Sequence, residues 1–267
     1  MRRRTPVPPS PLPQRSGIDP VRLRMPADGG FPTVGAFLAA HYAGGAGAAA
    51  VADLLATGQV VAADGRPRYA GDRYEPGGWL WFHRELPPEP PVPFPIRVVY
   101  RDEHLLVVDK PHFLATTPRG GHITQTALAR LRHDLDLPTL SPAHRLDRLT
   151  AGLVMFSIRP EDRGAYQLLF QARRVHKTYR AVAAYDPSLS LPRTVRSHIE
   201  KTRGVIAATE VPDAEPNAET LVELLDRTAT LGHYRLTPRT GRTHQLRVHM
   251  NALGLPLLGD PVYPTLT

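Results

Sequence analysis

The chain has 267 residues, of which 42% are hydrophobic and 22% charged, so it is long enough to bury a core and has the composition of a globular protein. It contains no cysteine, which excludes a disulfide scaffold and a thiolate zinc site. The 33 Lys and Arg residues against 25 Asp and Glu residues give a net charge of +8, and this excess favours a polyanionic partner.

Residues 1–29 are rich in arginine and proline and hold few large apolar side chains. They cannot bury enough surface to offset the entropy of ordering, so we expect a disordered basic tail. Residues 2–4 could open a targeting peptide, but no apolar stretch follows them. The longest uncharged segment, 29–52, is dominated by alanine and broken by glycine, which is a poor composition for a membrane span. These features indicate a cytoplasmic protein with no membrane partner.

Residues 30–86 are predicted to form a small module. Apolar residues at helical spacing follow Thr33, a side chain that caps helices, and recur up to Gly58, so we expect two helices. Apolar runs at 60–61 and 79–82, set between tight turns, predict short strands. A module of this size is near the lower limit for independent folding.

Residues 87–96 are mostly proline, which lacks a backbone donor and has a fixed φ, so we expect an extended, semi-rigid linker at a domain boundary. In residues 97–267, helices alternate with strands, some joined by turns of hairpin length. This pattern predicts an α+β domain with a mixed, mostly antiparallel sheet. The expected strands are 96–100, 105–109, 152–158, 175–185, 220–226 and 233–237, and the expected helices are 124–135, 161–173 and 241–253.

The segment 141–156 places a carboxylate, Asp147, between Arg145 and Arg148, ahead of a strongly apolar strand. The neighbouring guanidinium groups would keep Asp147 ionised, and it could then act as a nucleophile or base at neutral pH. From charge spacing alone, a surface ion pair beside an edge strand is the favoured interpretation.

A second basic stretch, 175–182, alternates so that Lys177, Tyr179 and Ala181 share one strand face. Several arginines lie close to it in the chain, and this combination suits phosphates and a base that needs an aromatic platform. The structural alternative is a half-buried tyrosine on a solvated cationic strand.

The third stretch, 235–259, contains four arginines and no carboxylate. A turn that opens a helix here can present backbone donors and arginines to phosphates. His244 and His249 stand five residues apart, which misses the spacing that places two metal ligands on one helix face, so no metal site is expected. The structural alternative is a plain amphipathic helix.

Together these stretches resemble the RluA-type pseudouridine synthase family of ribosomal large-subunit and transfer RNA enzymes. Residues 144–153 match its signature around the catalytic aspartate, 176–181 its tyrosine motif and 240–249 its third motif. Residues 107–111 look like the family's opening lysine-proline strand. The likeness covers about 97–263 and implies the pseudouridine synthase fold, conversion of uridine to pseudouridine in RNA, and no cofactor or metal.

By this resemblance Asp147 is the essential carboxylate, which attacks the ribose anomeric carbon, attacks the base, or removes a ribose proton. Arg247 would pair with that carboxylate, Tyr179 would lie against the target base, and Arg145 would help to hold the flipped-out nucleotide. Leu146 and Leu246 would form apolar walls. The remaining expected substrate contacts are His144, Lys177, Arg242, His244 and Gln245.

Residues 31–86 look like a small S-four-like RNA-binding module, of the type first described in a ribosomal small-subunit protein. Because 31–61 contains no Arg or Lys, a degenerate structural cap is the equal alternative. Leu149 and Ala151 replace the polar and serine residues common after the catalytic aspartate. Family members usually continue for another strand and helix beyond residues 259–263, so we expect either a short member or a truncated one.

We therefore expect a monomeric enzyme that isomerises specific uridines, in ribosomal RNA rather than transfer RNA, through Asp147. The rival is a non-catalytic RNA-binding or ribosome-assembly protein on the same fold. An Asp-based glycoside hydrolase would need a second positioned carboxylate, and none is found near the motifs.

Overall fold

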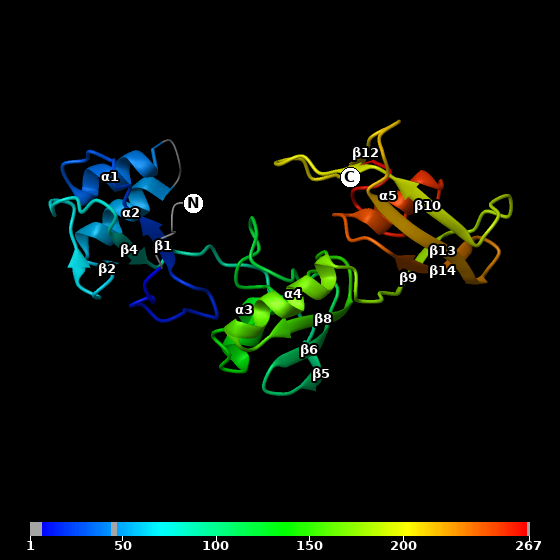
Figure 1. The fold of residues 1–267 in the computed structure, drawn as a ribbon, viewed down its shortest axis with the longest axis horizontal. Helices are drawn as coiled ribbons and strands as arrows, with labels where there is room; N and C mark the ends of the chain where they lie inside the picture. Colours follow the sequence, from blue (N-terminus) through cyan, green and yellow to red (C-terminus); the bar gives the residue numbers. More distant parts are fainter. Residues whose placement is uncertain (1–6, 44–46, 266–267) are drawn as a thin grey trace. The chain divides into compact units, whose positions relative to one another are not determined.

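The computed structural model of the chain describes residues 7–43 and 47–265, and the chain forms two compact units, Met1–Arg163 and Gly164–Thr267 (Figure 1). Helices and sheets are mixed, and the strands pair antiparallel within each sheet. The α+β class with a mostly antiparallel sheet is therefore confirmed. The boundary at 163 falls inside the segment 97–267 that was predicted as one catalytic domain, and the linker 87–96 lies within the first unit.

The first unit opens with a small sheet in the order β1-β4-β2-β3, covered by two helices whose apolar side chains share one core with it. The N-cap of the first helix is Thr33, as predicted, and its side chain accepts from the amide of Ala36. The elements are β1 (Val21–Arg24), α1 (Val34–His41), α2 (Gly47–Ala56), β2 (Val60–Ala62), β3 (Pro67–Arg68) and β4 (Trp79–Phe82).

The prediction of a disordered tail over 1–29 is wrong for residues 7–29, and residues 1–6 lie outside the described part. β1 pairs antiparallel with β4, with Val21 opposite Phe82. Val21 and Leu23 pack against the core, while the arginines that alternate with them are exposed. The segment thus has the alternation of a half-buried strand, although its average composition is polar. The segment before β1 is also tied down, since Asp19 pairs with Arg132 at 3.0 Å.

The rest of the first unit is a second sheet, ordered β5-β6-β8-β7, packed against one helix. Alternate side chains of β6 and β8 face this core, and α3 adds Leu128 and Leu131 to it. The side chain of Thr126 caps α3 by accepting from the amide of Ala129. The elements are β5 (Arg97–Arg101), β6 (Leu105–Lys110), α3 (Ala127–Asp134), β7 (Ser141–Pro142), β8 (Gly152–Ser157) and the 3-10 turn Pro160–Asp162.

The proline-rich linker is docked on this second sheet domain. The carboxylate of Glu89 accepts from the amides of Ile123 (3.0 Å), Thr124 (2.7 Å) and Gln125 (3.2 Å) and from the hydroxyl of Thr124 (2.9 Å). Burial raises the pKa of Glu89, but these hydrogen bonds outweigh it and hold the pKa below its ordinary value. One carboxylate thus satisfies the backbone donors that precede α3 and fixes the linker.

Replacing Glu89 by alanine should lower the free energy of unfolding by about 1.5–3 kcal/mol at neutral pH, the usual net worth of hydrogen bonds to a charged group. Because the folded pKa is depressed, this contribution is present above the ordinary value of 4.5 and is lost as the pH falls through the folded pKa. Urea unfolding at pH 7 and at pH 3 checks both points, with Glu89→Gln as the control that keeps the size. An equal difference between parent and Glu89→Ala at both pH values would contradict the assignment.

The second unit is built on a sheet ordered β10-β13-β14-β9, with α5 packed on one face. Its elements are α4 (Arg163–Gln171), which begins at the boundary, then β9 (Tyr179–Ala184), β10 (Arg193–Ser197), β11 (Ile199–Glu200), β12 (Thr209–Glu210), β13 (Ala218–Arg227), β14 (Leu231–Pro238) and α5 (Gln245–Ala252). Val222, Leu236 and Met250 form the centre of its core. No helix within residues 7–43 and 47–265 is long and apolar enough to cross a membrane.

Candidate active site

Asp147 lies in the loop that joins β7 to β8, residues 143–151, which we call the Asp147 loop. The hydroxyl of Thr116 donates to the carbonyl of Leu146 (2.8 Å) and accepts from its amide (3.1 Å). The amide of Thr150 donates to the carbonyl of Asp147 (3.0 Å). Leu146 packs against the core of the sheet, so it anchors the loop from below. Asp147 is thus presented, half-buried, on a backbone that is fixed on both sides.

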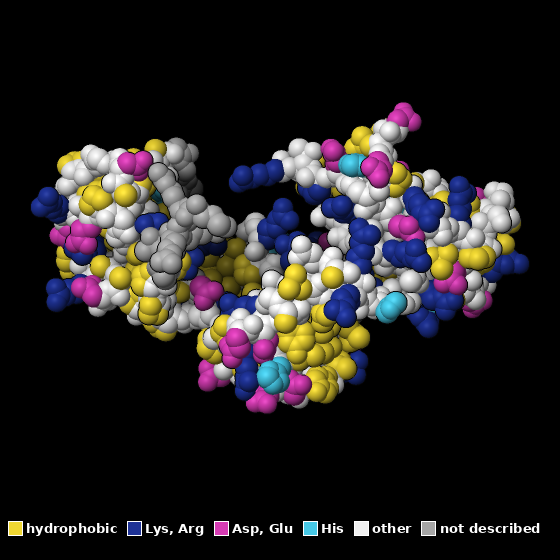
Figure 2. Space-filling view, viewed as in Figure 1, with side chains coloured by type: hydrophobic (Ala, Val, Ile, Leu, Met, Phe, Trp, Pro, Cys, Tyr) yellow, Lys and Arg dark blue, Asp and Glu magenta, His cyan; other side chains and the backbone are white. Residues whose placement is uncertain are grey.

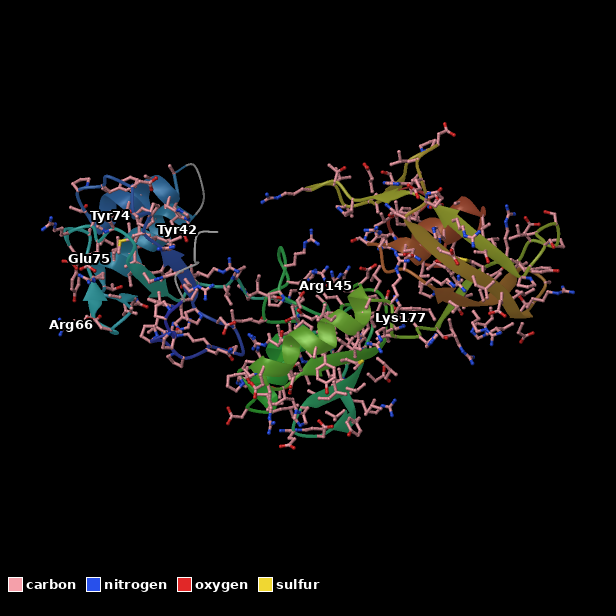
Figure 3. The ribbon with its side chains drawn as sticks, viewed as in Figure 1. Tyr42, Arg66, Tyr74, Glu75, Arg145 and Lys177 are labelled. Carbon is pink, nitrogen blue, oxygen red and sulfur yellow. The ribbon has the colours of Figure 1, made fainter. Side chains whose placement is uncertain are left out.

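The two residues before Leu146 differ in their surroundings. The ring nitrogen Nε2 of His144 accepts from the amide of Met155 (3.2 Å), so this side chain supports the start of β8. Arg145 is exposed, as expected of a residue that reaches a nucleotide (Figure 3). Within this pair, Arg145 is the more exposed side chain.

Lys110 is fully buried at the end of β6, a feature that the sequence analysis missed. Its ammonium donates to the carbonyls of Leu114 (2.7 Å) and Pro111 (3.0 Å). Burial lowers the pKa of Lys110 to about 8, while the charge of Asp147 acts in the opposite direction. The alternation of β6, which also buries Leu106 and Val108, is the signal that assigns this lysine to the core face.

The depressed pKa of Lys110 makes a pH-dependent contribution to stability. Between about pH 8 and 10.5 the unfolded chain keeps the proton that the folded chain has lost, so the free energy of unfolding rises with pH in this window. Urea unfolding of the parent chain, compared with Lys110→Met over pH 7–10.5, should show this rise in the parent alone. A constant difference between the two chains would contradict it.

The second motif places Lys177 and Tyr179 in the second unit. Tyr179 opens β9, pairs with Leu236 of β14 and is half-buried against the core of that unit. Lys177 donates from Nζ to the carbonyl of Thr240 (2.9 Å), and burial lowers its pKa. The second and third motifs therefore lie together in the structure.

The third motif forms a turn that is held by Gln245, the first residue of α5. Its amide oxygen accepts from the hydroxyl of Thr240 (2.7 Å) and the amide of Arg242 (3.0 Å). Its amide nitrogen donates to the carbonyl of Glu219 and the hydroxyl of Thr220, each at 2.9 Å. All four hydrogen-bonding positions are used and the side chain is buried, so Gln245 supports the turn instead of contacting substrate as predicted.

The remaining residues of this motif divide between core and surface. His244 has φ +59° at the N-cap of α5, and its Nδ1 lies 3.0 Å from the hydroxyl of Tyr263. Leu246 packs against the core, which fits an apolar wall, and Arg242 is exposed. His249 is fully buried, and burial lowers its pKa to about 4. Among the described residues, no group of three or more His, Asp or Glu side chains is placed to hold a metal ion.

Arg247 forms a bidentate ion pair with Asp260, with Nε to Oδ2 and Nη2 to Oδ1 both at 2.6 Å. Burial raises the pKa of Asp260, but Arg247 and the amides of Val262 and Tyr263 outweigh it and lower the pKa. A guanidinium has five N–H donors, so this pair is compatible with a second carboxylate. Asp147 belongs to the other unit, and its pair with Arg247 stays a prediction. Asp260 was not among the predicted residues, and it is the first carboxylate after Asp226.

The second unit also carries a cationic groove of about 610 Å³. Glu219 holds two of its guanidinium groups, those of Arg196 (2.9 Å) and Arg239 (3.3 Å). Figure 2 shows Lys and Arg side chains gathered over this unit. The other basic residues that line the groove are Arg173, His176 and Lys177. Cations in such excess over one carboxylate suit the phosphate backbone of a nucleic acid.

Comparison with known proteins matches residues 104–252 to a family described as RNA pseudouridylate synthase. The chain is 37% identical over 172 residues to ribosomal large subunit pseudouridine synthase D of Pseudomonas aeruginosa, covering 63% of this chain and 53% of that protein. It is 32% identical over 188 residues to dual-specificity RNA pseudouridine synthase RluA of Haemophilus influenzae, covering 65% and 80%.

Two further proteins extend this similarity. The mitochondrial tRNA pseudouridine(32) synthase of Saccharomyces cerevisiae is 30% identical over 190 residues, covering 70% of this chain and 41% of that protein. The solved structure of human RNA pseudouridylate synthase domain containing 1 has a TM-score of 0.53 and 28% identity, covering 64% of this chain and 71% of that one. The chain spans about half the length of several of the curated relatives it matches.

Proposed function

The chain belongs to the RNA pseudouridylate synthase family, and we propose that it isomerises specific uridines in RNA to pseudouridine with Asp147 as the catalytic carboxylate. The RluA-type resemblance seen in the sequence is confirmed by the family match and the relatives. The observation that carries the proposal is that the matched segment, 104–252, contains Asp147, Tyr179 and Arg247 together with the fixed Asp147 loop.

In the proposed reaction the bond from the ribose anomeric carbon to N1 of uracil breaks, the base turns, and a bond from the same carbon to C5 forms. The proton on C5 leaves and N1 gains one, so the product is an isomer. Asp147 attacks the anomeric carbon, attacks the base, or removes a ribose proton, and each route needs its ionised form. The hydroxyl of Tyr179 lies against the base and assists loss of the C5 proton.

The other predicted residues position the RNA. Arg145, exposed on the Asp147 loop, holds the extruded nucleotide, whose base must leave its stack before it reaches a carboxylate. Arg247 orients Asp147 from a guanidinium that Asp260 already fixes. Lys177, Arg242, His244 and Leu246 supply contacts to the backbone and the base.

We propose ribosomal RNA as the substrate in preference to transfer RNA. The relatives named above include a ribosomal large-subunit enzyme and a transfer RNA enzyme, and the cationic groove fits the phosphates of either. The chain would act as a monomer in the cytoplasm, without cofactor or metal. Residues 30–86, which hold α1, α2 and β2 to β4, would serve as an S-four-like RNA-binding module.

Tritium release tests the proposal and selects the RNA. The parent chain is incubated with ribosomal and transfer RNA pools labelled at C5 of uridine, taken from cells that lack the gene. Release from the ribosomal pool is expected, since forming the bond to C5 displaces its hydrogen. Release from the transfer RNA pool alone would overturn the substrate assignment, and binding of both pools without release would favour the non-catalytic RNA-binding protein.

A further inference from the structure

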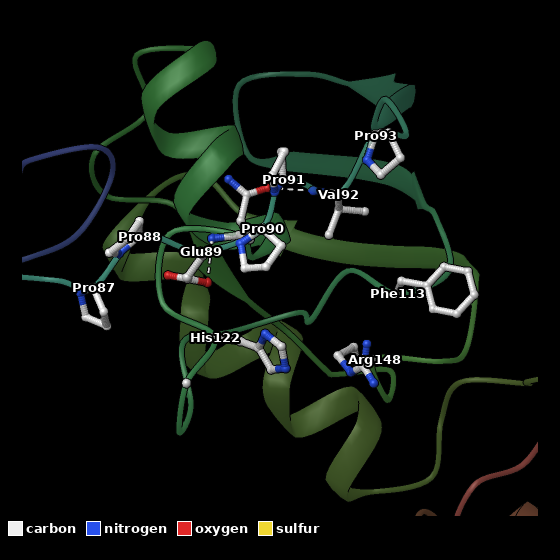
Figure 4. A pocket seen from close by; sticks show the side chains of 12 residues that line it. Pro87, Pro88, Glu89, Pro90, Pro91, Val92, Pro93, Phe113, His122 and Arg148 are labelled. Carbon is white, nitrogen blue, oxygen red and sulfur yellow. Dashed lines mark hydrogen bonds between the residues drawn. The ribbon is translucent and has the colours of Figure 1, made fainter.

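The docked linker forms one wall of a pocket of about 360 Å³ in the first unit, which we call the linker pocket (Figure 4). Five of its lining residues are prolines, whose rings are apolar and lack a backbone donor. The side chains that face the linker and can contact a ligand are Phe113, His122, Gln125 and Arg148, and the linker itself adds the carboxylate of Glu89, which is already hydrogen-bonded. The pocket therefore combines flat apolar surface with a cation, within the size range of small-ligand sites.

The wall of this pocket is held in place by hydrogen bonds of its own lining residues, Glu89, Val92 and Gln125. The hydrogen bonds that Glu89 accepts from Ile123, Thr124 and Gln125 fix the middle of the linker. The amide of Val92 donates to the side-chain oxygen of Gln125 (3.1 Å), and Arg130 donates to the carbonyls of Val92 and Phe94 (both 3.3 Å). A proline segment fixed at these points needs little further ordering when a ligand enters, which favours binding.

Phe113 is the unusual residue of the pocket. Its φ is +67°, a backbone conformation that glycine adopts freely and a bulky side chain only at a cost. The residue is 51% exposed and, among the described residues, its ring stacks only on Phe94 of the linker, with ring centroids 6.4 Å apart, so it gains little core packing to offset that cost. An exposed aromatic residue in a strained conformation points to a function outside folding.

The position of Phe113 ties the pocket to the candidate active site. The preceding residue, His112, has Nδ1 2.6 Å from the carbonyl of Leu149 in the Asp147 loop. Arg148 follows Asp147 directly, so their Cα atoms are one residue step apart, about 3.8 Å. Arg148 of the pocket and the proposed catalytic Asp147 are therefore consecutive residues of one loop.

We propose that the linker pocket binds the nucleotide next to the target uridine, with its base stacked on Phe113 and its phosphate paired with Arg148. This inference rests on the proposed function, since it takes the RNA at Asp147 as given. Aromatic rings accept bases of any sequence by stacking, and guanidinium groups pair with phosphate in a bidentate manner. His122 and the proline wall enclose the base.

One substitution at the pocket should affect stability and RNA affinity differently. Phe113→Gly removes the ring and relieves the strained φ, so the melting temperature should stay equal or rise, while RNA affinity should fall about tenfold. Affinity is measured in an Asp147→Asn background, in which the RNA is not converted. Tyr100→Ala, which removes a ring of equal exposure (52%) from β5, is the control and should leave affinity unchanged. A lower melting temperature with unchanged affinity would make Phe113 a packing residue and overturn the proposal.

An abasic series identifies the occupant. The substrate RNA found by tritium release is prepared with a single abasic ribose at each position flanking the target. One abasic position should weaken binding of the parent about tenfold and leave Phe113→Gly unaffected, because both changes remove the same stack. Additive losses at all positions would overturn the proposal. If the parent chain converts no RNA, the proposed function is wrong. If the parent chain and Phe113→Gly convert RNA equally well, only the proposed role of the linker pocket is wrong.

Discussion

Replacing Asp147 by alanine should abolish turnover, lowering the rate by about 10³-fold or more, while RNA affinity stays within a few-fold of the parent chain. The rate falls because each route from uridine to pseudouridine uses this carboxylate as nucleophile or base. Affinity persists because phosphate contacts from arginines dominate nucleic-acid binding, and the cationic groove of the second unit is untouched. Single-turnover conversion and RNA binding are measured on the same preparation.

The matched control for this variant is Asp134→Ala, which makes the same chemical change at an exposed position at the end of α3. It should leave both rate and affinity unchanged. Parallel loss of affinity and rate in Asp147→Ala would mean that Asp147 contributes to folding or RNA contact. Retained turnover would remove it from the chemistry altogether.

Replacing Asp260 by alanine should lower the stability of the second unit by about 3–5 kcal/mol, because it leaves the guanidinium of Arg247 without the carboxylate that holds it. The side chains are only 12% and 4% exposed, so water replaces little of the lost interaction. The amides of Val262 and Tyr263 lose their acceptor as well. Urea unfolding at neutral pH measures the loss.

A double-mutant cycle separates the structural role of this pair from the proposed catalytic one. Arg247→Ala with Asp260→Ala should be less destabilised than the sum of the single variants, since neither charge is then left alone. In turnover, every variant that lacks Arg247 should stay inactive, because the residue proposed to orient Asp147 is absent. Additive stabilities would contradict the buried pair, and an active Arg247→Ala variant would contradict the pairing with Asp147.

The spacing of hydrophobic residues predicted most of the helices and strands. It failed where a short strand pattern lies within a segment whose average composition is polar. The alternation of Leu106, Val108 and Lys110 is visible in the sequence, and β6 forms where it predicts. β1 was missed because four residues of strand pattern lie within an arginine- and proline-rich stretch, and the partner that completes them is β4, some sixty residues later. Such long-range pairing leaves no local signal.

Turn chemistry explains the differences at element ends. The expected helix 241–253 begins only at Gln245, because the residues before it form a turn that the Gln245 amide holds. The expected strand 175–185 begins at Tyr179. The short strands β10 to β12 were not predicted, since their sequences are polar and their stability comes from pairing along an edge and within a two-stranded hairpin.

The candidate site was predicted in outline by its motifs, but not in its supporting contacts. The motifs predict Asp147, Tyr179 and Arg247 as site residues, whereas the role of Gln245 depends on a partner, Thr220, twenty-five residues away. Asp260 follows Arg247 by thirteen residues, and neither helical nor strand periodicity predicts that two residues at this spacing are in contact. The positive φ of Phe113 could not be predicted either, because the identity of one residue does not determine its backbone conformation.

Nucleoside analysis of RNA after incubation with the parent chain tests the central claim most directly. The RNA is digested completely and its uridine, pseudouridine and free uracil are quantified by mass spectrometry. The expected result is a loss of uridine matched by an equal gain of pseudouridine, with no free uracil, and none of this with Asp147→Ala. Unchanged uridine with the parent chain, or free uracil without pseudouridine, would contradict the proposal that this chain is an RNA pseudouridine synthase acting through Asp147.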